Sequence, residues 1–212
     1  MHFEFLVEDQ STKEALQILL PKILEQRHTF KINPYRGVGH LPKDLRPRTD
    51  ASKRILLDQL PRLLKGYGKQ FRNYSAIIVV LCDLDDRDRE SFAHELRGAY
   101  EACDPKPEAE FYFAIEETEA WYLGDLTAIL QAYPNAKETI LATYVNDAIC
   151  GTWEILANAV HEGGCQALSV KGRQTEGAEK TKWARKICPF MKIDRNNSPS
   201  FNEFCSGLRS HA

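Results

Sequence analysis

The sequence predicts an α/β fold, a mostly parallel sheet flanked by helices with a helical C-terminal extension. Two observations predict it. In the first 130 residues, short apolar segments alternate with segments whose apolar residues recur at helical spacing, as in a parallel sheet covered on both faces. From residue 135 onwards the spacing is largely helical and no strong strand signal occurs. We therefore expect an α/β core in residues 1–130 and a helical part of the same domain in residues 131–212.

Three apolar segments are predicted to be strands. Residues 3–8 form a short, mostly apolar segment near the N-terminus. Residues 75–82 (SAIIVVLC) are apolar on both faces, as expected for a strand inside a parallel sheet. Residues 109–115 (AEFYFAI) form the third. Between the first two, residues 28–49 are rich in proline and glycine and predict loops, around a possible short strand at residues 30–32.

Segments of helical spacing separate these strands. Ser11 or Thr12 can cap the first helix, in which Pro21 predicts a kink or an early end. Further helices are expected over residues 51–65, 89–103, 117–131 and 201–208.

Composition indicates an ordinary globular protein, with 43% hydrophobic and 27% charged residues in 212. The N-terminus lacks the basic and apolar regions of a signal peptide, and the longest apolar run is far shorter than the roughly 20 residues that cross a bilayer. We therefore expect a soluble, cytoplasmic protein. The six cysteines include no closely spaced pair, which favours buried reduced thiols over a zinc site.

A carboxylate ends each of the three predicted strands. Glu8 ends the first, Asp83 follows the second with Asp85 just beyond, and Glu116 follows the third, with Glu119 close behind. Ligands of open α/β sheets bind outside the carboxyl ends of the strands. If the strands are neighbours, these acids converge. Close carboxylates repel each other, and a divalent cation keeps them ionised together.

The donor set favours Mg²⁺ or Mn²⁺, because only oxygen ligands are present. On an extended strand, Asp83 and Asp85 point to the same side and can share a metal. Glu116 and Glu119 share a helix face if their helix begins early enough. The alternative is that such acids only cap helices or favour helix dipoles, which suits Asp86, Asp88 and Glu117.

Charge is segregated although the net charge is only −2. Residues 27–54 hold eight basic residues against two acids, and residues 171–195 hold eight against three. Residues 101–119 hold seven acids and one lysine. Ordinary solvated surface explains this, and so does a phosphate-rich polymer held by basic segments across an acid-bound metal. The candidate nucleic-acid-binding residues are Arg36, Lys43, Arg46, Arg48 and Lys180.

The strand-end Glu and the Asp-x-Asp after a buried strand resemble the TOPRIM fold of topoisomerases, primases and OLD-type nucleases. The segments FLVEDQSTKEAL, IVVLCDLDDRD, FAIEETEAWYLGD and SPSFNEFCSGL resemble the family labelled domain of unknown function 4276. The resemblance runs through nearly the whole chain in scattered segments. It implies a nuclease-like protein that works with an AAA- or ABC-type ATPase in prokaryotic, anti-phage defence.

The resemblance also implies residue roles. Glu8 matches the first TOPRIM acid, a metal ligand or general acid–base, and Asp83 and Asp85 match the Asp-x-Asp metal ligands. Glu116 and Glu119 match later acids of the family. The sequence departs from the family pattern at two places. Asp9 replaces the usual glycine, and Ser11-Thr12 leaves the second acid missing unless Glu14 substitutes for it.

The leading hypothesis is metal-dependent cleavage of phosphodiester bonds in nucleic acid, with DNA as the expected substrate. Lys171, Lys180 and Lys192 are candidates for stabilising the transition state, and His40 is a candidate if its loop folds over the sheet edge. The second hypothesis is an inactive module that binds nucleic acid or a partner ATPase. A phosphohydrolase of haloacid-dehalogenase type is the third, although that family carries its Asp-x-Asp on the first strand.

Overall fold

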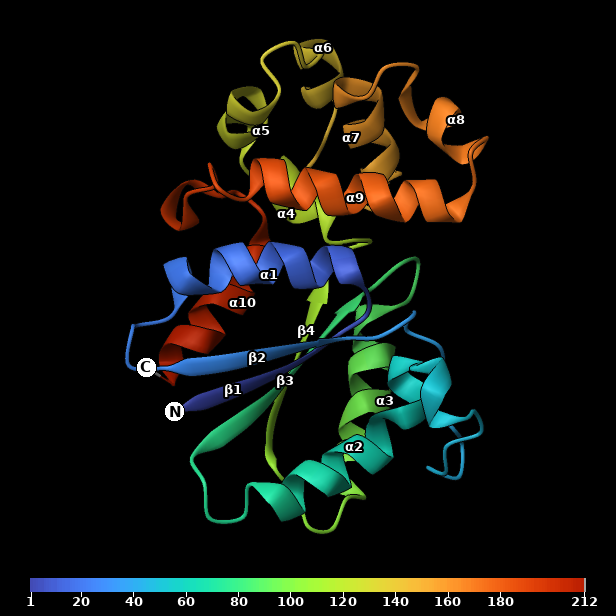
Figure 1. Ribbon diagram of the computed structural model, residues 1–212, viewed down its shortest axis with the longest axis vertical. Helices are drawn as coiled ribbons and strands as arrows, with labels where there is room; N and C mark the ends of the chain where they lie inside the picture. The colour runs from blue at the N-terminus through green and yellow to red at the C-terminus, as the bar shows by residue number, and fades with distance from the viewer. Residues whose placement is uncertain (212) are drawn as a thin grey trace.

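Four parallel strands form the sheet of this protein, described for residues 1–211 by a computed structural model (Figure 1). The sheet order is β2-β1-β3-β4. The strands are β1 (His2–Val7), β2 (Thr29–Pro34), β3 (Ala76–Asp83) and β4 (Glu108–Ala114). Val7 lies opposite Leu81 of β3, and Asp83 lies opposite Ala114 of β4, so the carboxyl ends of the strands meet at one edge. The predicted α/β fold class is confirmed.

The chain changes direction across the sheet between β1 and β3. It first passes from β1 to the edge strand β2 through α1 (Gln10–Ile23). It then crosses to β3 through α2 (Leu56–Gln70), and from β3 to β4 through α3 (Arg89–Glu101). Outside the carboxyl ends of the strands, such a switch point leaves a crevice where α/β proteins bind ligands.

Two hydrophobic cores occupy the two faces of the sheet. Alternate residues of each strand point to opposite faces, so Phe5 packs with α1 and Leu6 packs with α2. The core on the α1 face extends through Trp121 and Trp183 into the C-terminal helices. The core on the other face joins α2 and α3 to β1, β3 and β4.

After β4, the described residues form a C-terminal part that contains helices and loops but no strand. Its helices are α4 (Glu119–Leu123), α5 (Leu126–Ala132), α6 (Glu138–Leu141), α7 (Thr152–Val160), α8 (Gly164–Ser169), α9 (Arg173–Ile187) and α10 (Pro199–Ser210). In Figure 1, α9 lies along α1, and α5 to α8 lie beyond α9, away from the sheet. Helix α10 returns to the sheet on the α1 face, where Phe204 packs against Phe5 and Tyr112.

Three predicted helices differ in detail from those observed. Pro21 lies inside α1, which continues to Ile23 without ending early. The helix expected over residues 51–65 is a 3-10 turn (Ala51–Lys53) followed by α2, which runs to Gln70. The helix expected over residues 117–131 is divided into α4 and α5, because the side chain of Asp125 caps the second of them at the Ala128 amide.

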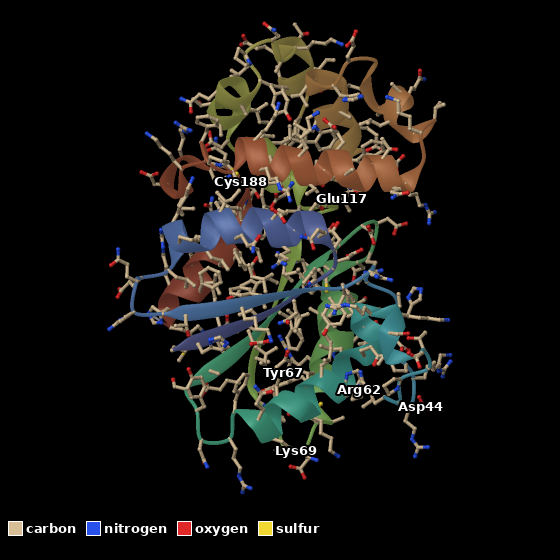
Figure 2. All side chains as sticks on the ribbon, viewed as in Figure 1. Asp44, Arg62, Tyr67, Lys69, Glu117 and Cys188 are labelled. Carbon is tan, nitrogen blue, oxygen red and sulfur yellow. The ribbon has the colours of Figure 1, made fainter. Side chains whose placement is uncertain are left out.

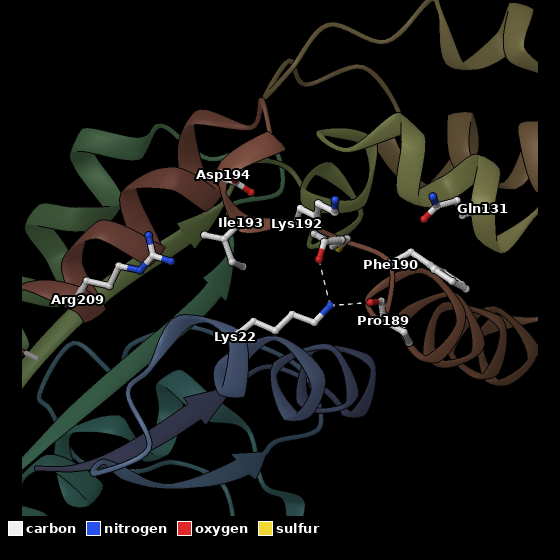
Figure 3. Close-up of a pocket in the computed structure, with 9 residues that line it drawn as sticks. Lys22, Gln131, Pro189, Phe190, Lys192, Ile193, Asp194 and Arg209 are labelled. Atoms are coloured by element: carbon white, nitrogen blue, oxygen red, sulfur yellow. Dashed lines mark hydrogen bonds between the residues drawn. The ribbon is translucent and has the colours of Figure 1, made fainter.

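Lys22 joins the end of α1 to the end of α9. Its ammonium donates hydrogen bonds to the backbone carbonyls of Cys188 (2.8 Å), Pro189 (2.7 Å) and Met191 (3.0 Å), beside an open pocket (Figure 3). A cation at the C-terminus of a helix is favourable, because the last carbonyls carry partial negative charge. The contact fixes α9 along α1.

Two further expectations concern the cysteines and the membrane. None of the six cysteines is in a disulfide; four are buried, Cys165 is half-buried and Cys150 is exposed. In residues 1–211 no helix combines the length and the apolar character needed to cross a bilayer.

Candidate functional site

Glu8 and Asp83 lie on neighbouring strands at the switch point. Glu8 directly follows β1, and Asp83 is the last residue of β3, with which β1 pairs. Burial, together with the charges of Asp85 and Asp9, raises the pKa of Glu8 to about 7. Burial and the charges of Glu8 and Asp9 raise the pKa of Asp83 well above its ordinary value. The structure thus brings these two predicted acids together.

Threonine and aspartate side chains from neighbouring elements hold the site in place. Asp83 accepts a hydrogen bond from the Thr118 hydroxyl (3.0 Å), which also lies 3.2 Å from the hydroxyl of Thr12 on α1. Asp9 caps α1, accepting from the Thr12 amide (2.8 Å) and the Ser11 hydroxyl (2.8 Å). Asp9 therefore adds a further acid beside Glu8.

An ion-pair cluster between α9 and the segment from Glu117 to the first residue of α4 completes the acidic group. Lys180 on α9 donates to Glu117 (2.8 Å) and lies 3.6 Å from Glu119 (Glu117 is labelled in Figure 2). Burial and the charge of Glu119 raise the pKa of Glu117 to about 7, although Lys180 opposes the shift. Burial disfavours the charged form of Lys180, but the attraction of Glu119 and Glu117 prevails and raises its pKa. Both Glu117 and Glu119 influence the pKa of Asp83, so this cluster adjoins the strand-end acids.

Three buried carboxylate oxygens in this region have no hydrogen-bond partner within the protein. They are Oε2 of Glu8, Oε2 of Glu117 and Oε1 of Glu119. Unpartnered buried carboxylate oxygens are costly, and an oxygen-liganded cation relieves that cost. The donor set therefore fits Mg²⁺ or Mn²⁺. Within residues 1–211, however, no group of three or more Asp, Glu, His or Cys side chains is arranged to hold a metal in this conformation.

Asp85 lies beyond the end of β3, so Asp83 and Asp85 are not alternate residues of one extended strand. Strand β3 ends at Asp83, and Asp85 adopts a left-handed backbone conformation (φ 51°). Its amide donates to the carbonyl of Glu116, which continues the pairing of β3 with β4 for one more step. The prediction that both aspartates share one side of a strand was therefore wrong, although the charge of Asp85 still acts on Glu8.

Glu116 turns away from the acidic group toward α7. Its carboxylate accepts hydrogen bonds from the amides of Cys150 (3.1 Å), Gly151 (3.0 Å) and Thr152 (2.9 Å), and from the Thr152 hydroxyl. Burial alone would raise the pKa of Glu116, but these hydrogen bonds outweigh it and lower the pKa. Glu116 also has a left-handed conformation (φ 59°), and α4 begins only at Glu119, so the predicted shared helix face does not form.

The predicted basic residues fall into two places. Arg36, Lys43, Arg46 and Arg48 are exposed in the loop between β2 and α2, as is His40. This loop starts at the edge of the sheet that carries the acids, because the Gly37 amide donates to the carbonyl of Glu8 (3.1 Å). Lys180 is apart from them, inside the acidic group. Glu14 pairs with Arg185 (2.9 Å) instead of joining the strand-end acids.

Sequence reasoning missed three contributors to this site. Asp9 was noted only as a departure from the family pattern, and Glu117 only as a helix-dipole residue. Arg87 was not selected at all, although its guanidinium lies 3.6 Å from Asp85. The signal for Arg87 was its place in the short segment between a strand-end acid and the next helix.

Comparison with protein families identifies the family of this chain. A family model described as "Domain of unknown function (DUF4276)" matches residues 7–209. Neither the curated proteins nor the solved structures gave a match. The matched region includes Glu8, Asp83, Glu119 and Lys180. Because the match extends over almost the whole chain, this protein belongs to the family of domain of unknown function 4276.

Proposed function

We propose that this protein is a TOPRIM-like nuclease that uses Mg²⁺ or Mn²⁺ to cleave phosphodiester bonds in DNA. The observation that carries the proposal is the group of buried carboxylates at the switch point of the sheet. Burial raises the pKa values of Glu8, Asp83 and Glu117. One carboxylate oxygen each of Glu8, Glu117 and Glu119 has no hydrogen-bond partner within the protein. Perturbed acids that converge at a ligand-binding edge are typical of catalytic sites.

Glu8 and Asp83 are the residues that would hold the metal, with Asp85 and Glu119 nearby. Mg²⁺ usually keeps several waters and takes only one or two protein carboxylates, with substrate phosphate completing its shell. A cage of three protein ligands is therefore not required. When bound, the metal supplies an activated water and neutralises charge on the scissile phosphate.

The chain's own residues supply the remaining chemistry. Oε2 of Glu8 has no partner within the protein, so this carboxylate has an oxygen available to bind the metal or to accept a proton from the attacking water. Lys180 brings a positive charge to the acids from α9 and can stabilise charge on the phosphate in the transition state. Arg36, Lys43, Arg46 and Arg48 would hold the nucleic-acid backbone without reading its sequence.

The second candidate function is an inactive binding module, and the ion pair of Glu14 with Arg185 favours it. The missing second acid is not replaced, because Glu14 is paired with Arg185. In this alternative the acidic group only shapes a docking surface for nucleic acid or an AAA- or ABC-type ATPase. We further propose that the protein works in the cytoplasm with an AAA- or ABC-type ATPase, in prokaryotic defence against phage.

The first experiment is cleavage of plasmid and single-stranded DNA with Mg²⁺ or Mn²⁺. Loss of a residue that only contacts a metal ligand typically reduces metal affinity or activity 10–100-fold. Asp83 would bind the metal directly, so Asp83→Asn should reduce cleavage by about 100-fold or more. The matched control is Asp86→Asn, an exposed acid three residues away, which should cut like the wild type. Equal cutting by wild type and Asp83→Asn would refute this site, and no cutting by any of them would favour the binding module.

A further inference from the structure

Arg87 lies in the segment that connects β3 to α3, beside the acidic group. Its amide donates to the carbonyl of Leu84 (3.1 Å), which closes a turn directly after Asp83. The next residue, Asp88, caps α3 by accepting from the Ser91 amide (2.9 Å). Arg87 is therefore held between two fixed points, the end of a central strand and the start of a helix.

The guanidinium of Arg87 is only partly used by the protein. It lies over the ring of Phe92 (4.7 Å to the centroid), and Nη2 is 3.6 Å from Asp85, too far for a hydrogen bond. Nη1 is buried and has no hydrogen-bond partner within the protein. Among the unpartnered buried side-chain nitrogens of residues 1–211, it is the one with a permanent positive charge.

Arg87 lies beside the acids of the site, because its Nη2 is 3.6 Å from the carboxylate of Asp85. Lys180, the other cation of the site, already has Glu117 and Glu119 as partners. Arg87 differs from Lys180 because its Nη1 has no hydrogen-bond partner within the protein. A planar guanidinium offers its donors in a fixed fork that matches two oxygens of a phosphate.

We propose that Arg87 binds the non-bridging oxygens of a nucleic-acid phosphate at this site and anchors the substrate beside Glu8 and Asp83. This inference rests on the proposed function for its substrate class. It extends that function by assigning a substrate-binding residue from the segment after β3. Stacking on Phe92 orients the guanidinium before the substrate arrives, so little side-chain freedom is lost on binding.

A rival explanation is that Arg87 only compensates the charge of the acids. The two explanations differ in measurable ways. Charge compensation alone shifts the pH profile of the site but leaves the number of phosphate contacts unchanged. A phosphate contact adds about 0.7–0.9 to the slope of log affinity against log salt concentration.

The test compares wild type, Arg87→Gln and Arg87→Lys, with Arg97→Gln as the matched control. Gln keeps a side chain over Phe92 but loses the charge, and Lys keeps the charge but loses the fork. Arg97 is an exposed arginine farther along α3. Binding of a fluorescent DNA oligonucleotide is measured by anisotropy in EDTA, where no metal-dependent cutting occurs, over a series of salt concentrations. Cleavage with Mg²⁺ is measured in parallel, and thermal unfolding checks that each variant is folded.

We expect Arg87→Gln to weaken DNA binding and kcat/KM about 10- to 100-fold, the range for hydrogen bonds to charged groups. For this variant, the slope of log affinity against log salt concentration should decrease in magnitude by about 0.7–0.9, the value of one phosphate contact. Arg87→Lys should recover part of the affinity, and Arg97→Gln should match the wild type. Equal affinity and salt slope in Arg87→Gln and wild type would overturn the inference, even if the wild type cuts DNA. Binding that depends on Arg87 without any cutting would support the inference and contradict the nuclease proposal. Absence of both DNA binding and DNA cutting by the wild type would overturn both proposals.

Discussion

At the scale of single residues, Glu8 gives the clearest expectation, because its pKa links folding to pH. The folded protein raises this pKa from 4.5 to about 7, chiefly through burial. A carboxyl group with a raised pKa in the folded state adds stability below pH 4.5. That contribution is lost as the pH rises through about 7.

We therefore expect the stability advantage of Glu8→Gln over the wild type to grow between pH 5 and pH 8 in EDTA. Glutamine keeps the shape of the protonated acid and cannot ionise. Thermal unfolding at several pH values measures this, with the exposed Glu90→Gln as the control. Mg²⁺ should reduce the difference at pH 8, since it favours the ionised acid. A constant difference from pH 5 to pH 8 would argue against the buried, repelled state of Glu8.

The sequence predicted Glu8 and Asp83 correctly as neighbours, because both directly end apolar segments whose strand character was plain. The sequence could not predict that the later acids, Glu116 and Glu117, contact different parts of the protein. Glu116 and Glu117 are adjacent in sequence, yet one turns to α7 and the other to Lys180. A left-handed conformation at Glu116 causes this, and no pattern of apolar spacing reports such a conformation.

At the scale of elements, Glu116 anchors the start of α7 to the end of β4. Its carboxylate satisfies amides at the helix N-terminus, where a negative charge is favourable. We expect Glu116→Gln to lower the free energy of unfolding by about 1–2 kcal/mol, as for loss of a strong helix cap. Chemical denaturation measures it.

The control for this prediction is Glu138→Gln, an exposed acid in the first turn of α6. It should change stability by less than about 0.5 kcal/mol. Metal-dependent cleavage should survive in Glu116→Gln to within a few-fold, because the carboxylate faces α7. Loss of cleavage with unchanged stability would contradict this prediction and would indicate that Glu116 belongs to the metal site.

Element boundaries followed the sequence where local signals were strong and departed where distant contacts decide. Strand β3 was evident from eight consecutive apolar or strand-end residues. The break between α4 and α5 was not, because Asp125 also receives Arg195 and the Lys192 amide from far along the chain. Proline was misleading at Pro21, since α1 accommodates it inside the helix.

At the scale of the whole molecule, the loop between β2 and α2 begins at the acidic edge of the sheet and carries four exposed basic side chains. We expect replacement of Arg36, Lys43, Arg46 and Arg48 by Gln to weaken DNA binding and to reduce its salt slope by about 0.7–0.9 per lost contact. Stability should change little, because the loop is held by backbone bonds such as that from the Arg36 amide to Arg54. Anisotropy titrations at several salt concentrations test this.

The matched control changes the same amount of charge elsewhere, at Arg62, Lys65, Lys69 and Arg72. These exposed residues lie along and just after α2; Figure 2 labels Arg62 and Lys69, and also Asp44 within the basic loop. If both quadruple variants lose affinity equally, only the net charge matters, and the loop has no special role in holding DNA.

The site is assembled from residues that are made at very different times. Glu8 and Asp83 belong to the first half of the chain, whereas Lys180 is carried by α9, near the end. During translation, a nascent chain can complete its four strands while the ammonium that pairs with Glu117 and Glu119 has yet to be synthesised. The charges of Glu117 and Glu119 are thus balanced only after α9 has been synthesised, whereas the strands that carry Glu8 and Asp83 are made much earlier.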